Sequence, residues 1–334
     1  MISVPVAEQS QVSEARREAG FAAKRLGFDD TAAGRVAIVA TELATNIVKY
    51  AAPGEILVGS FEDETGTGVE IIALDKAAGL GNPTDALRDG HSTGGSAGTG
   101  LGAASRQSET FDVASWPGRG TAILARVKAR PSGRERAAGP LPLFGSVAVP
   151  VRGEEVCGDA VALRREADGW IAMVADGLGH GPQAAAAGGE AVRLFMRSRE
   201  TRPRDIMASL HAGLRHTRGG AVAVARYEAE RGVLVFSGIG NIAGAVVGGA
   251  QTRRTVSLAG TAGHVARRFG EFEYPFDPGS LLVMCSDGIG TSWTLDGYPG
   301  LNGAHPSLIA AVLYRDFTRV RDDATVLVVR EAAP

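Results

Sequence analysis

The sequence predicts a two-domain protein of the mixed α/β (α+β) class, and three observations support this prediction. The chain has 334 residues, which corresponds to about two domains of ordinary size. A segment near residues 128–142 lacks the periodicity of a helix or a strand. The part before it reads as helix followed by mostly antiparallel strands, and the part after it as many strands with a few helices. We therefore expect a two-layer α/β sandwich, followed by two sheets covered by helices.

The composition is that of a soluble globular protein, with 44% hydrophobic and 22% charged residues and a formal net charge of −2. This balance gives no overall attraction to nucleic acid or to an anionic membrane, so we expect neither as a partner. Cys157 and Cys285 are the only cysteines, which excludes a disulfide framework or a zinc cluster and favours a reducing compartment. The chain has no signal-peptide pattern and no apolar run of about 18 residues, so we expect a cytoplasmic protein.

In the N-terminal part, apolar residues recur on one face of a helix expected over residues 32–51. These residues are Val36, Val39, Ala40, Leu43, Ile47 and Tyr50. Glu42 and Asn46, one turn apart, share a second face of this helix. Strands are expected over 56–61, 69–74, 111–115 and 121–127, and Asp75 follows the second of them. A glycine-rich segment over 90–102 leads into a short helix.

The composition changes at residues 129–144, which are rich in Arg, Pro and Gly. We interpret this segment as a solvated interdomain linker and assign no function to its positive charge. The expected domains are therefore 1–128 and 145–334.

The C-terminal part contains seven strand-like runs and three helical windows. Strands are expected over 146–151, 170–175, 221–227, 233–237, 243–247, 281–285 and 324–329, and helices over 183–199, 204–215 and 306–317.

Three features in order suggest a nucleotide site in the N-terminal part: Glu42-x-x-x-Asn46, Asp75 followed by Gly79, and Gly98-x-Gly100-x-Gly102. Backbone N–H groups of a glycine-rich loop can hold phosphate oxygens, although such a loop is also consistent with mere mobility. The combination resembles the GHKL ATPase (Bergerat) fold over residues 1–128, and within it the serine kinases that act on anti-sigma-factor antagonists and in stressosome switches.

This resemblance implies that the N-terminal domain binds ATP with Mg²⁺. Asn46 would hold the Mg²⁺, Asp75 would accept a hydrogen bond from the adenine amino group, and Glu42 would act as a catalytic base toward a serine hydroxyl. The glycines Gly79, Gly98, Gly100 and Gly102 would border the nucleotide. The family pattern has a glycine where this chain has Ala77. A solvated helix face for Glu42 and Asn46, and a strand-end cap for Asp75, are the alternatives.

Four aspartates lie at the ends of apolar runs in the C-terminal part: Asp159, Asp176, Asp287 and Asp322. Each alone is more often a turn residue, because Asp next to Gly favours turns. Carboxylates that converge from several strand ends repel one another, and divalent cations relieve that repulsion.

The segments that carry these residues resemble the successive motifs of PP2C-type metal-dependent serine/threonine phosphatases, most closely the sporulation and stress-response branch. These segments are 153–159, 174–181, 237–241, 285–288 and 321–325. The resemblance covers residues 145–334 and implies an αββα sandwich.

It also implies that Asp176 is catalytic and bridges two Mn²⁺ or Mg²⁺ ions, assisted by the Gly177 carbonyl. Asp159 would serve one ion, and Asp287 and Asp322 the other. The metals would lower the pKa of a water that attacks the phosphorus of a phosphoserine or phosphothreonine. Asp323 is a second candidate for the place of Asp322.

Three further residues stay outside the predicted catalytic set. His180 could protonate the leaving group, but a packing or solvent-facing role is equally open. Cys157 and Cys285 are expected to be small buried apolar residues.

Together the two resemblances imply a bifunctional regulator of partner switching, which phosphorylates and dephosphorylates a STAS-domain anti-sigma-factor antagonist or stressosome protein. A sigma factor or a downstream switch protein is a second candidate partner. Two alternatives are a phosphatase whose N-terminal domain only binds ATP or a partner, and a hydrolase of small phosphoesters, which the motifs disfavour.

Overall fold

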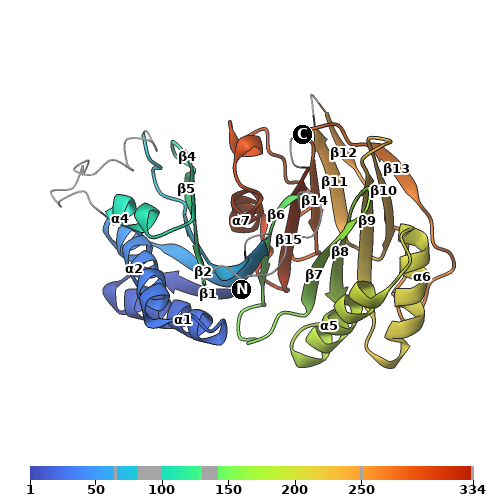
Figure 1. The fold of residues 1–334 in the computed structure, drawn as a ribbon, viewed down its shortest axis with the longest axis horizontal. Coiled ribbons are helices and arrows are strands. Elements are labelled where there is room, and N and C mark those ends of the chain that lie inside the picture. Colours follow the sequence, from blue (N-terminus) through green and yellow to red (C-terminus); the bar gives the residue numbers. More distant parts are fainter. Residues whose placement is uncertain (64–65, 82–99, 130–141, 249–250, 332–334) are drawn as a thin grey trace. The chain divides into compact units, whose positions relative to one another are not determined.

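The computed structural model describes residues 1–63, 66–81, 100–129, 142–248 and 251–331 (Figure 1). The chain forms two compact units. The first unit is Met1–Gly139 together with Leu295–Val312, and the second is Pro140–Thr294 together with Leu313–Pro334. Segment 295–312 therefore groups with the N-terminal part, although it follows most of the second unit in the sequence.

The first unit has a single antiparallel sheet in the order β1-β2-β3-β5-β4. Its elements are β1 (Ile2–Val6), α1 (Gln9–Arg25), α2 (Asp30–Asn46), the π-helical turn η1 (Ile47–Ala51), β2 (Gly54–Asp63), β3 (Gly66–Asp75), α4 (Gly100–Arg106), β4 (Thr110–Trp116) and β5 (Gly120–Lys128).

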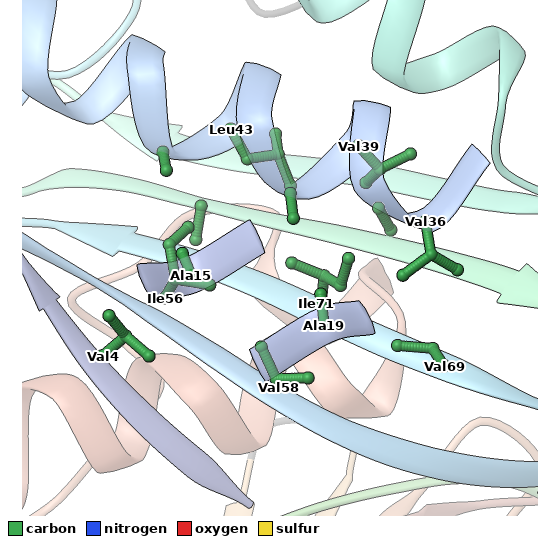
Figure 2. Packing of buried hydrophobic residues seen from close by; sticks show 14 of the residues in the cluster. Val4, Ala15, Ala19, Val36, Val39, Leu43, Ile56, Val58, Val69 and Ile71 are labelled. Atoms are coloured by element: carbon green, nitrogen blue, oxygen red, sulfur yellow. The ribbon is translucent and has the colours of Figure 1, made fainter. Parts of the chain in front are cut away.

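Helices α1 and α2 pack on one face of this sheet. The carboxylate of Asp29 caps α2 by accepting the N–H of Ala32 at 2.8 Å. Figure 2 shows the resulting core, in which residues of both helices meet alternate residues of β2 and β3. Those labelled there are Val4, Ala15, Ala19, Val36, Val39, Leu43, Ile56, Val58, Val69 and Ile71. The expected helix and strands of this part are all present.

The opposite face of the sheet is also buried. Because side chains alternate along a strand, Leu57, Ile72 and Leu124 point away from the helices, and all three are fully buried. Segment 295–312 lies on this face. The indole Nε1 of Trp116 donates to the carbonyl of Pro299 at 3.0 Å, and the Tyr298 ring meets the Trp116 ring edge-on at 5.1 Å.

The second unit contains two five-stranded sheets, in the orders β13-β10-β9-β8-β7 and β12-β11-β14-β15-β6. The strands are β6 (Leu143–Val149), β7 (Asp159–Glu166), β8 (Gly169–Gly177), β9 (Gly220–Glu228), β10 (Val233–Ile239), β11 (Ala243–Gly248), β12 (Gln251–Arg254), β13 (Phe272–Pro275), β14 (Leu281–Cys285) and β15 (Ala324–Arg330). Its helices are α5 (Pro182–Arg197) and α6 (Pro203–Gly213), with the short 3₁₀ turn η2 (Leu214–His216). The 3₁₀ turn η3 (Leu301–Gly303) lies in the first unit, and helix α7 (Pro306–Phe317) begins in the first unit and ends in the second.

Two cores hold this unit together. One lies between the sheets and joins Trp170 and Phe236 of the first sheet to Leu282 and Leu327 of the second. The other lies between the first sheet and helices α5 and α6, around Phe195. Helix α7 is continuous from the first unit into the second, and its residues 306–315 are buried.

Every strand expected in the C-terminal part is present, and the structure adds β7, β12 and β13. These strands lack a clear apolar run, because β7 is half-buried and ends in Arg164, Arg165 and Glu166 while β12 is fully exposed. Among the described residues, no helix has both the length and the apolar character needed to cross a bilayer.

Candidate functional site

In the first unit, Glu42 and Asn46 lie against the beginning of α4. A side chain at Gly100 would place its Cβ 2.9 Å from Oε2 of Glu42 and 3.4 Å from Oδ1 of Asn46. The beginning of α4 is therefore so close to the pair that an added methyl group would displace the end of the Glu42 side chain. Within the described part of the chain, Nδ2 of Asn46 is buried and has no hydrogen-bond partner. An orphaned amide beside a carboxylate fits a site that a polar ligand completes.

Asp75 ends β3 and holds the turn that follows it. Its Oδ1 accepts the N–H of Ala77 at 2.9 Å and the N–H of Thr121 on β5 at 3.3 Å. Gly79 has φ of +80°, and a Cβ there would lie 2.4 Å from the carbonyl oxygen of Trp116. Only glycine fits this close approach, so the turn after Asp75 is fixed by backbone contacts.

Of the residues expected at the nucleotide site, the structure brings Glu42, Asn46 and Gly100 together. Gly100 and Gly102 both lie in α4, and Gly102 is buried. Gly98 lies outside the described residues, as does most of the glycine-rich segment.

In the second unit, Asp159 and Asp176 are direct cross-strand neighbours, because β7 and β8 pair antiparallel with these two residues in register. The start of α5 packs tightly behind them. A Cβ at Gly177 would lie 2.3 Å from the carbonyl oxygen of Ala184, and one at Gly158 would lie 2.6 Å from the Ala184 Cβ. These glycines thus let the helix approach the ends of both strands.

Burial and mutual repulsion favour the protonated forms of this aspartate pair. Burial, followed by repulsion from Asp159, Asp287 and Asp322, raises the pKa of Asp176 to about 8. Burial raises the pKa of Asp159 to about 7, although the nearby hydroxyls of Ser286 and Thr325 partly oppose the rise. Oδ2 of Asp159 is buried and has no partner among the described residues.

Asp287 follows β14 and is held by a residue that the sequence did not single out. Nδ2 of Asn241 donates to Oδ2 of Asp287 at 2.5 Å. Burial, and then repulsion from Asp322, raises the pKa of Asp287. Asn241 ends one of the segments that carried the family resemblance, and its Gly-Asn turn was the available signal.

Asp322 and Asp323 differ in what their carboxylates do. Oδ1 of Asp323 accepts the N–H of Val151, and its Oδ2 accepts the N–H of Gly158, both at 2.6 Å. Asp323 is only 2% exposed. Both of its carboxylate oxygens are used by backbone N–H groups. Asp322 is partly exposed, and its Oδ1 accepts the adjacent N–H of Asp323 at 2.9 Å.

The remaining candidates lie beside this cluster. Nδ1 of the exposed His180 is 2.7 Å from Oε1 of Glu154. Burial raises the pKa of Cys157 to about 12, which leaves it a neutral thiol, and Cys285 is fully buried. Among the described residues, no group of three or more His, Cys, Asp or Glu side chains is arranged so that it could hold a metal ion. The carboxyl groups nonetheless lie close enough to perturb one another's pKa values, and the donor set is all oxygen, which fits Mg²⁺ or Mn²⁺.

Two family models match the chain. The model described as the histidine kinase-like ATPase domain matches residues 6–127, and the model described as stage II sporulation protein E (SpoIIE) matches residues 166–331. The second match includes Asp176, Asp287 and Asp322 but begins after Asp159, which the strand register places in the cluster.

Several individual proteins are similar to this chain. The serine/threonine-protein kinase RsbT of Bacillus subtilis is 34% identical over 122 residues, which cover 36% of this chain and 92% of RsbT. A chain from a structural study of the bacterial stressosome has a TM-score of 0.53 and 25% identity, covering 57% of this chain and 99% of that one. The structure of the PP2C phosphatase domain of SpoIIE from Bacillus subtilis, with a fragment of its regulatory domain, has a TM-score of 0.48 and 16% identity. The match covers 97% of this chain and 94% of that one.

Proposed function

This chain belongs to the histidine kinase-like ATPase family through residues 6–127 and has a SpoIIE-type PP2C domain over residues 166–331, and from this premise we propose that it is a bifunctional regulator of partner switching. Its second unit would remove phosphate from a phosphoserine or phosphothreonine protein. Its first unit would transfer phosphate from ATP to a serine of the same class of protein.

The observation that carries the phosphatase proposal is the in-register pair of Asp159 and Asp176, with Asp287 close enough to raise the pKa of Asp176. A group of buried carboxyls with raised pKa values is stabilised when cations replace its protons. We assign Asp159, Asp176, Asp287, Asp322 and the Gly177 carbonyl as ligands of two Mn²⁺ or Mg²⁺ ions.

We assign Asp322 in preference to Asp323 because the Asp323 carboxylate is already used by the N–H groups of Val151 and Gly158. When bound, the two cations supply positive charge for the phosphoryl group and acidify a water. The chain's own residues hold this site: Asn241 orients Asp287, and Asp323 fixes the backbone on either side of the loop before Asp159.

The kinase proposal is supported by the contact of Gly100 with Glu42 and Asn46. The amide oxygen of Asn46 would hold a Mg²⁺ ion, and the carboxylate of Glu42 would take the proton of the incoming serine hydroxyl. Asp75 would bind the adenine amino group, with Gly79, Gly98, Gly100 and Gly102 along the nucleotide. Ala77 favours the alternative, a first unit that binds ATP or a sigma-factor or STAS partner without phosphotransfer.

We propose a STAS-domain protein of the anti-sigma-antagonist or stressosome type as the substrate. RsbT and the stressosome chain support this class, because both are similar to this chain. The test is intact-mass spectrometry of such a protein from the same source, incubated first with the full chain and Mg-ATP, and then with Mn²⁺ after removal of ATP.

A phosphate adduct that appears in the first step and disappears in the second is the expected result. Loss from a partner phosphorylated beforehand, without any gain, would support the alternative of a regulatory first unit. A change in neither step would contradict the proposed substrate class. Hydrolysis of a phosphoserine peptide with Mn²⁺ then tests the phosphatase reaction independently of the partner.

A further inference from the structure

Three buried polar side chains form a closed network where segment 295–312 lies on the sheet of the first unit. Nε of Arg126 donates to Oε2 of Glu70 at 2.6 Å, and the hydroxyl of Ser307 donates to the same oxygen at 2.9 Å. Nη2 of Arg126 donates to the Ser307 hydroxyl at 3.0 Å. Ser307 is 0% exposed, Glu70 3% and Arg126 6%.

This network fixes the place of the segment on the sheet. A buried ion pair needs partners for its remaining donors and acceptors, and the Ser307 hydroxyl bonds both to Nη2 of Arg126 and to Oε2 of Glu70. The surrounding face is apolar, with Leu57, Ile72 and Leu124 fully buried. Apolar contacts tolerate sliding, whereas hydrogen bonds fix one position. The Ser307 network therefore sets the register of the segment together with the hydrogen bonds of Trp116 to Pro299 and of His305 to Asp112.

Ser307 stands at the beginning of α7, and the far end of this helix is tied to the loop that carries Asp287. The carbonyl of Phe317 accepts the N–H of Gly290, and the N–H of Arg319 donates to the carbonyl of Gly288, both at 2.7 Å. Thr318 forms an isolated β-bridge with Ile289. Asp322 follows within the same short connection to β15. A shift of α7 along its axis would therefore move both loops, as helix shifts do in other switching proteins.

The strands that hold Ser307 also lead to the candidate nucleotide site. β3 carries Glu70 and ends at Asp75, while β5 carries Arg126 and begins near Thr121, whose N–H donates to Asp75. One pair of strands thus bears both the Ser307 network and the residue assigned to adenine.

From this arrangement we propose that Ser307 is a positioning residue, which acts through α7 to set the loops bearing Asp287 and Asp322. The inference rests on the proposed metal-dependent phosphatase function.

The test compares the full chain with Ser307→Ala, which removes the hydroxyl, and Ser307→Thr, which keeps it. Ser3→Ala is the matched control, because the Ser3 hydroxyl also donates to a glutamate, Glu55, across the same sheet. Mn²⁺ affinity is measured by isothermal titration calorimetry, and hydrogen exchange is followed in residues 286–290 and 318–323. Hydrolysis of p-nitrophenyl phosphate is recorded in parallel.

We expect Ser307→Ala to bind Mn²⁺ about threefold or more weakly and to exchange faster in both loops, with Ser307→Thr and Ser3→Ala close to the wild type. A folded Ser307→Ala protein with unchanged affinity and exchange would overturn the inference, as would equal effects of Ser3→Ala. Should Ser307→Ala fail to fold, Glu70→Gln weakens the same network and the same comparison applies. If the wild type itself neither binds Mn²⁺ nor hydrolyses phosphoesters, the proposed function is wrong.

Discussion

Asp176 is the residue whose substitution tests the proposed metal site most directly. Replacing it with Asn removes one buried negative charge from the cluster, and we expect phosphatase activity to fall at least about 100-fold, because a direct ligand should matter no less than its outer-shell partners. The metal-free variant should unfold at a higher temperature than the wild type, because the repulsion within the cluster is reduced.

Asp168→Asn is the control for this substitution. Asp168 is also in the β7–β8 hairpin, but it pairs with Arg226 at 3.1 Å and lies apart from the cluster. Its loss should leave activity unchanged and cost about 1 kcal/mol or less. Retained activity in Asp176→Asn would contradict its assignment as a ligand.

The raised pKa values of Asp159 and Asp176 predict how the stability of the metal-free protein depends on pH. Below the ordinary carboxyl value of 3.8, folded and unfolded chains are both protonated. As pH rises from there to about 8, the unfolded chain releases its protons first, so the free energy of unfolding falls; above this range it levels off. Mn²⁺ replaces the protons, so its stabilising effect should grow between pH 6 and pH 8.

Urea unfolding in EDTA at several pH values measures this dependence. The Asp159→Asn/Asp176→Asn double variant should show a flatter curve than the wild type. Parallel curves for the two proteins would contradict the raised pKa values.

Glu42 separates the two functions that the first unit could have. Glu42→Gln keeps the size and polarity of the side chain but removes the base, so a kinase should lose phosphotransfer while nucleotide binding stays within about threefold. The measurements are intact mass of the partner after incubation with Mg-ATP and calorimetric titration with ATP. If neither the wild type nor the variant phosphorylates the partner while both bind ATP, the first unit is a binding module.

At the scale of elements, Asp323 joins the connection before β15 to the ends of the loop between β6 and β7. Asp323→Asn would turn one of its two acceptors into an amide N–H that faces Val151 or Gly158, so we expect a loss of about 1–3 kcal/mol in the free energy of unfolding. Asp322→Asn should instead weaken Mn²⁺ binding with little change in stability. Urea unfolding and Mn²⁺ titration of the two variants test this division, and the reverse pattern would make Asp323 the ligand.

The elements show which features the sequence could predict. The apolar period of α2 and the apolar runs of β3, β5, β8 and β14 were sufficient to locate them, because burial dictates those patterns. Strand β7 escaped prediction because its half-buried residues alternate weakly and end in charged ones. The order of the site motifs was visible, but the direct pairing of Asp159 with Asp176 depends on strand register, which no local pattern encodes.

At the scale of the whole molecule, the sequence located the composition change between the two parts but could not predict segment 295–312 in the first unit. That placement depends on contacts between residues far apart in the sequence, such as Ser307 with Glu70 and His305 with Asp112. The unbroken apolar runs at 71–74 in β3 and 122–125 in β5 were the available signal, because a strand that is apolar on both faces needs a cover on each.

This dependence predicts that residues 1–129 alone make an incomplete domain. Without segment 295–312, the face that bears Leu57, Ile72 and Leu124 loses a cover, and each side chain of this size contributes about 1.5–3 kcal/mol when fully buried. We expect the fragment to self-associate in size-exclusion chromatography with light scattering, and to unfold at a lower temperature than the same residues within the full chain. A synthetic peptide of residues 295–312 should reduce both effects, whereas the same peptide with Ser307→Ala should do so less well, because it leaves Glu70 and Arg126 without their shared partner. A fragment that is monomeric and unaffected by the peptide would show that the helices α1 and α2 are sufficient to stabilise the sheet.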